Sequence, residues 1–255
     1  MATEQIIKCF KVIEFLAKNK NSTVDQIYLE TELSRSSIFR ILSTLEKIDY
    51  VKRILAAEGD IWELDYKFLT ISHSVLQYVD IREKVNVVLK SLSAEIKETV
   101  QLGIFHNNKV IYVDRIDSSD NLIKISFDNL GYEFEINSVA AGMVLAAYLS
   151  KKDLEDLLKN LNLKKYTKNT IVNKEEFKKF LVKVKDQGYA YNDQGYAIGV
   201  RGIAAPIFNF ENKAVGAINI TGHIISITDN RVDELIDKLK DASKEASRLM
   251  GFHNF

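Results

Sequence analysis

The chain has 255 residues, and 46% of them are hydrophobic, which is enough to bury the core of one large domain or two modest ones. Its 35 basic and 35 acidic residues cancel, which argues against a protein that coats nucleic acid through an overall positive field. A single cysteine, Cys9, excludes an internal disulfide and indicates a reducing compartment. The start of the chain does not read as an export signal, and the longest apolar run, Val139 to Leu149, is too short to cross a bilayer. We therefore expect a cytoplasmic protein without a membrane partner.

Two helices are predicted in the first part of the chain. Residues 4–19 place apolar side chains on one stripe of a helix: Ile6, Ile7, Phe10, Ile13 and Leu16. Ser22 and Asp25 have the spacing of a capping box, in which the hydroxyl accepts from the Asp25 amide and the carboxylate reaches back. This pattern predicts a second helix that runs to about Glu32.

A third helix is predicted to begin after the N-cap Ser34. Its apolar residues fall at the three-and-four spacing that faces a core: Ile38, Ile41, Leu42, Leu45 and Ile48. The opposite face carries hydroxyls and arginines, which suit a recognition helix. Small residues let the helix enter the major groove, and arginine bonds a guanine edge or a phosphate. We therefore expect DNA contacts from Ser34, Arg35, Ser36, Ser37 and Arg40.

A hairpin follows this helix. Residues 50–55 and 61–64 read as two short strands, with residues 56–60 as the turn. The turn carries no basic residue, so the expected phosphate contacts are Lys52 and Arg53 at the base of the hairpin. Helices and hairpin in this order indicate a winged helix-turn-helix domain. Because the charges of the first 64 residues nearly cancel, we expect weak non-specific DNA affinity and a specific site bound by a dimer.

The later part of the chain predicts an α+β domain, in which helices flank an antiparallel sheet. A helical linker is predicted over residues 66–78 and a further helix over residues 80–99. The predicted strands are residues 100–105, 110–115, 122–127, 189–192, 200–210 and 214–221, and the later helices are residues 138–149, 153–160, 174–187 and 229–250. A four-residue loop, His106 to Lys109, is expected between the first two strands, and Gly188 is expected to end helix 174–187.

Several segments, in order along the chain, resemble the IclR family of bacterial transcription regulators. They are residues 34–42 of the recognition helix, 110–115, 140–149, 188–190 and 199–207. The resemblance spans nearly the whole chain. It implies a winged helix-turn-helix domain at residues 1–64, a linker helix at residues 65–79 and a GAF-like effector-binding domain at residues 80–255. It also implies a homodimer or a dimer of dimers on a pseudo-palindromic operator in double-stranded DNA.

By position, the resemblance places an effector pocket on eight residues: Ile123, Ala140, Ala141, Asn192, Val200, Gly202, Asn219 and Thr221. Alternation along a strand puts Val200 and Gly202 on one face while Arg201 points away. The same alternation lets Asn219 and Thr221 share a face. The two alanines lie in the first turn of a predicted helix, where free amides favour an anion, so we expect a small carboxylate as the ligand.

Three positions depart from the family pattern. The histidine that usually opens the small-residue helix is Asn137, the lysine after its glycine is Met143, and the cysteine of an arginine-cysteine pair is Gly202. These changes predict a larger pocket with fewer hydrogen-bonding and charged groups. They leave open a degenerate pocket, in which case the regulator acts without a ligand or through a protein partner.

Other functional classes have less support. An enzyme is not expected, because the chain lacks a nucleotide-binding glycine motif, a nucleophile elbow, a HExxH helix and paired cysteines. No cofactor or metal is expected, because His106 and His223 have no ligand partners at a recognisable spacing. The neutral charge of the first segment also permits a winged helix that binds a protein instead of DNA. The favoured interpretation is a sequence-specific DNA-binding regulator that is controlled by a small carboxylate metabolite. A repressor is favoured over an activator.

Overall fold

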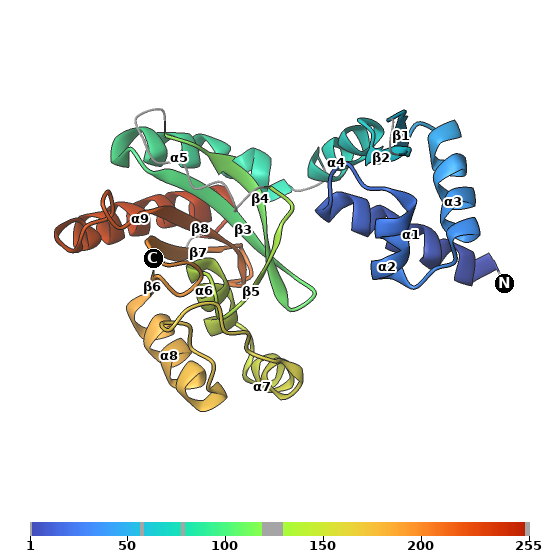
Figure 1. Cartoon of the computed structure of the whole chain (residues 1–255). Coiled ribbons are helices and arrows are strands. Elements are labelled where there is room, and N and C mark those ends of the chain that lie inside the picture. The colour runs from blue at the N-terminus through green and yellow to red at the C-terminus, as the bar shows by residue number, and fades with distance from the viewer. Residues whose placement is uncertain (1, 57–58, 78–79, 119–129, 253–255) are drawn as a thin grey trace. The chain divides into compact units, whose positions relative to one another are not determined.

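The computed structural model describes residues 2–56, 59–77, 80–118 and 130–252. The chain divides into two compact units, residues 1–78 and 79–255 (Figure 1). Each unit has a hydrophobic core of its own. None of the helices in the described ranges combines the length and the apolar character needed to cross a membrane.

The first unit contains four helices and a hairpin in its described residues. They are α1 (Ala2–Lys18), α2 (Val24–Thr31), α3 (Arg35–Lys47), β1 (Val51–Ile54), β2 (Ile61–Leu64) and α4 (Lys67–Gln77). The strands pair in antiparallel register, with Val51 opposite Leu64. This order is the winged helix-turn-helix that the sequence predicts. Helix α4 contacts the same unit, because Lys67 Nζ donates to the Ile48 carbonyl at 2.8 Å and the Phe68 ring lies 5.0 Å from that of Tyr50.

The capping box of α2 is formed by Thr23 and Gln26, so the prediction of Ser22 and Asp25 is wrong by one residue. Ser22 instead pairs with Trp62 of the hairpin. Its N–H donates to the Trp62 carbonyl at 3.2 Å, and the Trp62 N–H donates to the Ser22 carbonyl at 2.8 Å. Because this bridge holds Ser22 in an extended conformation, the helix begins one residue later.

Helix α3 begins as predicted, with Ser34 Oγ accepting from the Ser37 amide at 3.3 Å. Four of its five predicted core residues are buried: Ile38, Ile41, Leu42 and Leu45. Ile48 is the exception, with 45% of its surface exposed, because α3 ends at Lys47 and the helical spacing no longer applies.

Helix α1 enters the core only through its second half. Val12 and Leu16 are buried, whereas Ile6, Ile7 and Phe10 each expose more than half of their surface. The predicted apolar stripe is therefore wrong for the first turns of the helix. The exposed residues form an apolar face with no cover in the described part of the chain.

The second unit is built on a six-stranded antiparallel sheet in the order β5-β4-β3-β8-β7-β6. Its strands are β3 (Thr99–His106), β4 (Lys109–Ile116), β5 (Glu133–Glu135), β6 (Ala190–Asp193), β7 (Val200–Phe208) and β8 (Ala214–His223). Gln101 lies opposite Asn219, and Gly202 lies opposite both Asn192 and Thr221. The register therefore brings polar residues from β3, β6 and β8 to one region of the sheet, around Gly202 of β7.

Helices cover both faces of this sheet (Figure 1). They are α5 (Asp80–Ile96), α6 (Ala140–Ala147), α7 (Lys151–Asn160), α8 (Lys174–Gln187) and α9 (Asp229–Leu249). Helices α5 and α9 pack together on one face. Helix α6 packs on the other face, and α8 packs against α6. All eight residues of α6 are buried. Gly142 allows its close approach, because a Cβ there would stand 2.6 Å from the Ile136 Cα.

Most predicted elements of this unit are present, which confirms the α+β class. Helix α5 ends at Ile96 instead of Thr99, and Gly188 ends α8 in the left-handed conformation as predicted. The expected four-residue loop is wrong. His106 pairs with Lys109, and the turn is Asn107-Asn108, both with positive φ as a type I′ hairpin requires. The strand predicted over residues 122–127 lies outside the described residues.

Candidate DNA-binding surface and effector pocket

The outer face of α3 presents Arg35, Ser36 and Arg40 to solvent. Arg35 Nε contacts Asp25 Oδ1 of α2 at 2.5 Å, and its guanidinium lies 4.2 Å from the ring centroid of Tyr28. The hydrogen bond to Asp25 raises the pKa of Arg35 above its ordinary value. Arg40 has no carboxylate partner among the described residues. Arg40 is therefore the more readily available of the two arginines for a phosphate or a base.

The two cations of the hairpin are also paired with acids. Lys52 Nζ lies 2.8 Å from Glu63 Oε2, and Arg53 forms an ion pair with Asp60. The hydrogen bond to Glu63 raises the pKa of Lys52. Both pairs are at the surface, where such interactions contribute little free energy, so a phosphate can replace the carboxylate. DNA binding through the hairpin therefore requires an exchange of ion pairs.

A small cavity lies between the start of α6 and the sheet. Its described lining is Gln101, Tyr112, Phe134, Ser138, Val139, Ala140, Asn192, Tyr196, Val200, Gly202, Asn219 and Thr221. Six of the eight predicted effector residues are among them. The cavity volume is about 30 Å³.

Two buried amides shape this cavity differently. Asn192 Nδ2 donates to the Ser138 carbonyl at 2.5 Å, and its Oδ1 accepts from the Gly195 amide at 2.9 Å. Asn219 Nδ2 donates to Gln101 Oε1 at 2.9 Å, while its Oδ1 has no hydrogen-bond partner in the described structure. Asn192 thus joins the start of α6 to the loop after β6. Asn219 presents an unused acceptor to the cavity.

The start of α6 has no side-chain cap. Val139 is the N-cap residue, and its apolar side chain makes no capping hydrogen bond. Val139 and Ala140 are both buried and both line the cavity. The first amides of a helix and its dipole attract negative charge, so this end of the cavity suits a carboxylate.

Two predicted pocket residues do not appear in this lining. Ala141 is directed to the sheet, since its Cβ lies 3.2 Å from the point where a Cβ on Gly103 would stand. Its side chain therefore does not line the cavity, because successive helical residues point in directions about 100° apart. Ile123 lies outside the described residues.

Only one of the three departures from the family pattern lies in the described lining of the cavity. Asn137 is buried and donates through Nδ2 to the carbonyls of Lys164 and Ile171, at 3.0 and 2.9 Å. Met143 is buried in the core around α6. Neither residue is part of the described lining, so only Gly202 changes the cavity itself. At Gly202 the side chain of the usual cysteine is missing, and a pocket larger and less polar than in the family stays a prediction.

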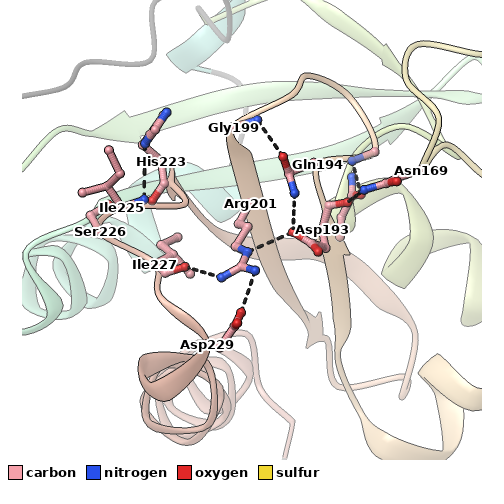
Figure 2. Close-up of polar contacts among 12 residues, drawn as sticks. Asn169, Asp193, Gln194, Gly199, Arg201, His223, Ile225, Ser226, Ile227 and Asp229 are labelled. Atoms are coloured by element: carbon pink, nitrogen blue, oxygen red, sulfur yellow. Dashed lines mark hydrogen bonds and ion pairs between the residues drawn. The ribbon is translucent and has the colours of Figure 1, made fainter.

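Arg201 is not part of the described cavity lining, as the strand alternation predicts. Its side chain points toward Asp193 and Asp229 (Figure 2). Its guanidinium contacts Asp193 Oδ1 at 2.9 Å, Asp229 Oδ1 at 2.6 Å and the Ile227 carbonyl at 2.8 Å. Figure 2 also shows Gln194, whose Oε1 accepts from the Gly199 amide at 3.0 Å. These contacts hold the loop after β6, which carries Tyr196 over the cavity.

Six lining residues were not predicted: Gln101, Tyr112, Phe134, Ser138, Val139 and Tyr196. Gln101 is a polar residue within an apolar strand, which is a signal, but its role depends on the pairing of β3 with β8. Tyr196 lies in a loop, and its ring packs 5.3 Å from that of Phe134. No group of three histidine, cysteine, aspartate or glutamate side chains in the described ranges could hold a metal ion.

Comparisons with known proteins agree with this architecture. Residues 5–54 match the model of the IclR helix-turn-helix domain, and residues 73–248 match that of the bacterial transcriptional regulator IclR C-terminal domain. The regulator KdgR of Escherichia coli is 25% identical over 254 residues, covering 100% of this chain and 95% of KdgR. The transcriptional repressor IclR of the same organism is 26% identical, covering 97% of this chain and 90% of the repressor.

A solved structure gives the same result. The IclR protein of Thermotoga maritima superposes with a TM-score of 0.78 at 27% identity, covering 98% of this chain and 100% of that protein. These relatives are transcription regulators and not enzymes. The two family models together match most of the chain. The chain therefore belongs to the IclR family of DNA-binding transcription regulators.

Proposed function

We propose that this regulator is a repressor, that it binds a pseudo-palindromic operator as a homodimer or a dimer of dimers, and that a small carboxylate metabolite in the α6 cavity controls this binding. The proposed DNA contacts are Ser34, Arg35, Ser36, Ser37 and Arg40 on α3, with Lys52 and Arg53 in the hairpin. Residues 65–79 act as the linker between a DNA-binding domain (1–64) and an effector domain (80–255). The proposed compartment is the cytoplasm.

The observation that carries the ligand proposal is the uncapped start of α6 at a cavity. A buried helix N-terminus leaves amide donors in need of partners, and a carboxylate supplies them. A ligand changes DNA affinity only if it binds two arrangements of the protein with different affinity. Occupancy of the cavity must therefore alter operator binding and not merely coexist with it.

The small cavity volume favours a second candidate, a regulator that acts without a ligand or through a protein partner. The decisive experiment selects an operator from random duplexes with the purified protein. A metabolite panel is then tested for thermal stabilisation of the protein and for altered operator affinity. Operator binding that no metabolite changes supports the second candidate. Failure to select any duplex over non-specific competitor, at low and moderate salt, contradicts the operator proposal itself.

Replacing Arg40 by alanine should weaken binding to the selected operator by about 1 to 3 kcal/mol if the guanidinium bonds a base. Folding should be unchanged, because the residue is exposed. A fluorescence titration with a labelled duplex measures the affinity. The matched control is Lys11→Ala, which removes an exposed cation on α1. Equal operator affinity of the Arg40 variant and the wild type removes Arg40 from the interface.

Replacing Lys52 by glutamine should weaken binding to all sequences alike, because a phosphate contact carries no sequence information. The slope of log affinity against log salt should flatten by about one unit. Glu63→Gln is the matched control, because it removes the acid of this ion pair and keeps the cation. It frees Lys52 from its 2.8 Å ion pair and should leave the slope as steep or steeper. A loss confined to the selected operator would show that Lys52 reads bases.

The protein should sediment as a dimer or larger at micromolar concentration. Three apolar residues of α4 are exposed, Leu69, Ile71 and Val75, and Phe68 is half-buried against Tyr50. The side chain of Leu76 lies outside the described side chains. The exposed apolar face of α1 adds to this surface. A monomer that binds the selected operator with full affinity contradicts the proposal.

A further inference from the structure

We infer that the ligand of the α6 cavity, which is partly open to solvent, is a small hydroxy acid, whose hydroxyl donates to Asn219 Oδ1 while its carboxylate meets the start of α6. This inference rests on the proposed function, because it assigns the chemistry of the same site. It adds a second requirement: besides its carboxylate, the ligand must carry a hydrogen-bond donor.

The first observation is the unused acceptor. Asn219 is 2% exposed, and its Oδ1 has no hydrogen-bond partner in the described structure. The other end of the amide donates to Gln101 Oε1 at 2.9 Å, and that contact directs the oxygen to the cavity. A buried acceptor without a donor is costly, so a ligand that supplies an O–H or N–H gains from pairing with it.

The second observation is the position of this acceptor relative to α6. A Cβ built on Gly202 would stand 3.6 Å from the Ala140 Cβ and 3.7 Å from Asn219 Oδ1. The helix start and the acceptor therefore flank the same point on β7. One small molecule can reach both, with its carboxylate and its hydroxyl separated by only a few atoms.

The third observation is the absence of charge in the described lining, which contains no lysine, arginine, histidine, aspartate or glutamate. The helix amides are then the source of positive potential for a carboxylate. A keto acid of the same skeleton offers only an acceptor where Asn219 Oδ1 is also an acceptor. The cavity should therefore prefer the hydroxy acid to the keto acid and to the deoxy acid.

The test uses matched sets of acids with the full-length protein. Each set contains the hydroxy, keto and deoxy forms of one skeleton: lactate, pyruvate and propionate; 3-hydroxybutyrate, acetoacetate and butyrate; malate, oxaloacetate and succinate. Both enantiomers of each hydroxy acid are included, with 1,2-propanediol as a probe that lacks the carboxylate. Calorimetry measures the affinities. We expect at least one hydroxy acid to bind about tenfold or more tightly than its keto and deoxy partners.

Variants connect this preference to Asn219. Asn219→Ser should reduce the hydroxy-to-keto affinity ratio to about one, because a hydroxyl donates as readily as it accepts. The ratio is insensitive to a general loss of stability, and Asn219→Leu provides a second variant without an acceptor. Asn160→Ser, the same chemical change at the exposed end of α7, should leave the ratio unchanged.

Three results would overturn the inference: equal affinity for hydroxy and keto acids, no binding of any hydroxy acid, or a preference that survives in both Asn219 variants. The proposed function can stand in the first case. A keto or deoxy acid that binds and alters operator affinity keeps the carboxylate effector while removing the hydroxyl requirement.

Discussion

The Trp62→Ala variant is expected to lose about 3 to 5 kcal/mol of unfolding free energy, all of it in the first unit. Trp62 is fully buried in the core of the winged helix-turn-helix, with the Phe39 ring edge-on at 6.3 Å. Small domains have total stabilities of only about 5 to 15 kcal/mol, so the loss should leave the DNA-binding unit partly unfolded. Operator binding should fall with it.

Hydrogen exchange of the full chain measures this effect unit by unit. Peptides from residues 2–56 should lose protection, and peptides from residues 130–252 should keep it, because the two cores are separate. Trp62→Phe is the matched control and should cost less than alanine. It keeps a ring and removes an indole N–H that has no acceptor in the described structure. Equal loss of protection in both units would show that they unfold together.

The Gly202→Leu variant is expected to abolish ligand binding while preserving operator binding. A leucine side chain on this face of β7 would extend into a cavity of about 30 Å³ and fill it. Overpacking of this kind costs about 1 to 3 kcal/mol, so the effector unit should remain folded but less stable. Thermal-shift titration with a ligand found in the metabolite panel gives the affinity, and a labelled operator gives the response.

Gly202→Ala serves as the control for this change. Its Cβ would make ordinary contacts, 3.6 Å from the Ala140 Cβ and 3.7 Å from Asn219 Oδ1, so the fold should be retained and ligand binding only weakened. A folded Gly202→Leu protein that binds the ligand normally, and still changes its operator affinity, would place the pocket elsewhere.

Sequence patterns correctly predicted the helix ends that depend on residues nearby in the chain. Ser34 caps α3 through an amide three residues away, and Gly188 ends α8 by adopting a positive φ. The cap of α2 was misplaced because Ser22 is held by Trp62, a partner from a distant hairpin. The buried part of α1 is shorter than predicted, because the spacing of apolar residues does not show how far along a helix the neighbouring elements cover it.

The pocket shows the same division between local and distant causes. Alternation along β7 and β8 correctly placed Val200, Gly202, Asn219 and Thr221 around one cavity. Gln101 was missed because its position depends on the register of β3 against β8. The side chain of Ala141 lies outside the lining because the rotation of α6 against the sheet is set by packing, which includes the close approach of Gly142 to Ile136. Such features need the tertiary structure.

The separate cores of the two units have a consequence for the evolution of new regulators. The core around Trp62 and the core around α6 lie in different units and share no residue. Substitutions far apart and without shared partners have nearly additive effects on stability. Mutations that alter the cavity can therefore accumulate without weakening the unit that reads DNA, and the reverse also holds. Under the proposed function, a lineage can change the metabolite it senses while keeping its set of genes, or acquire new genes while keeping its signal.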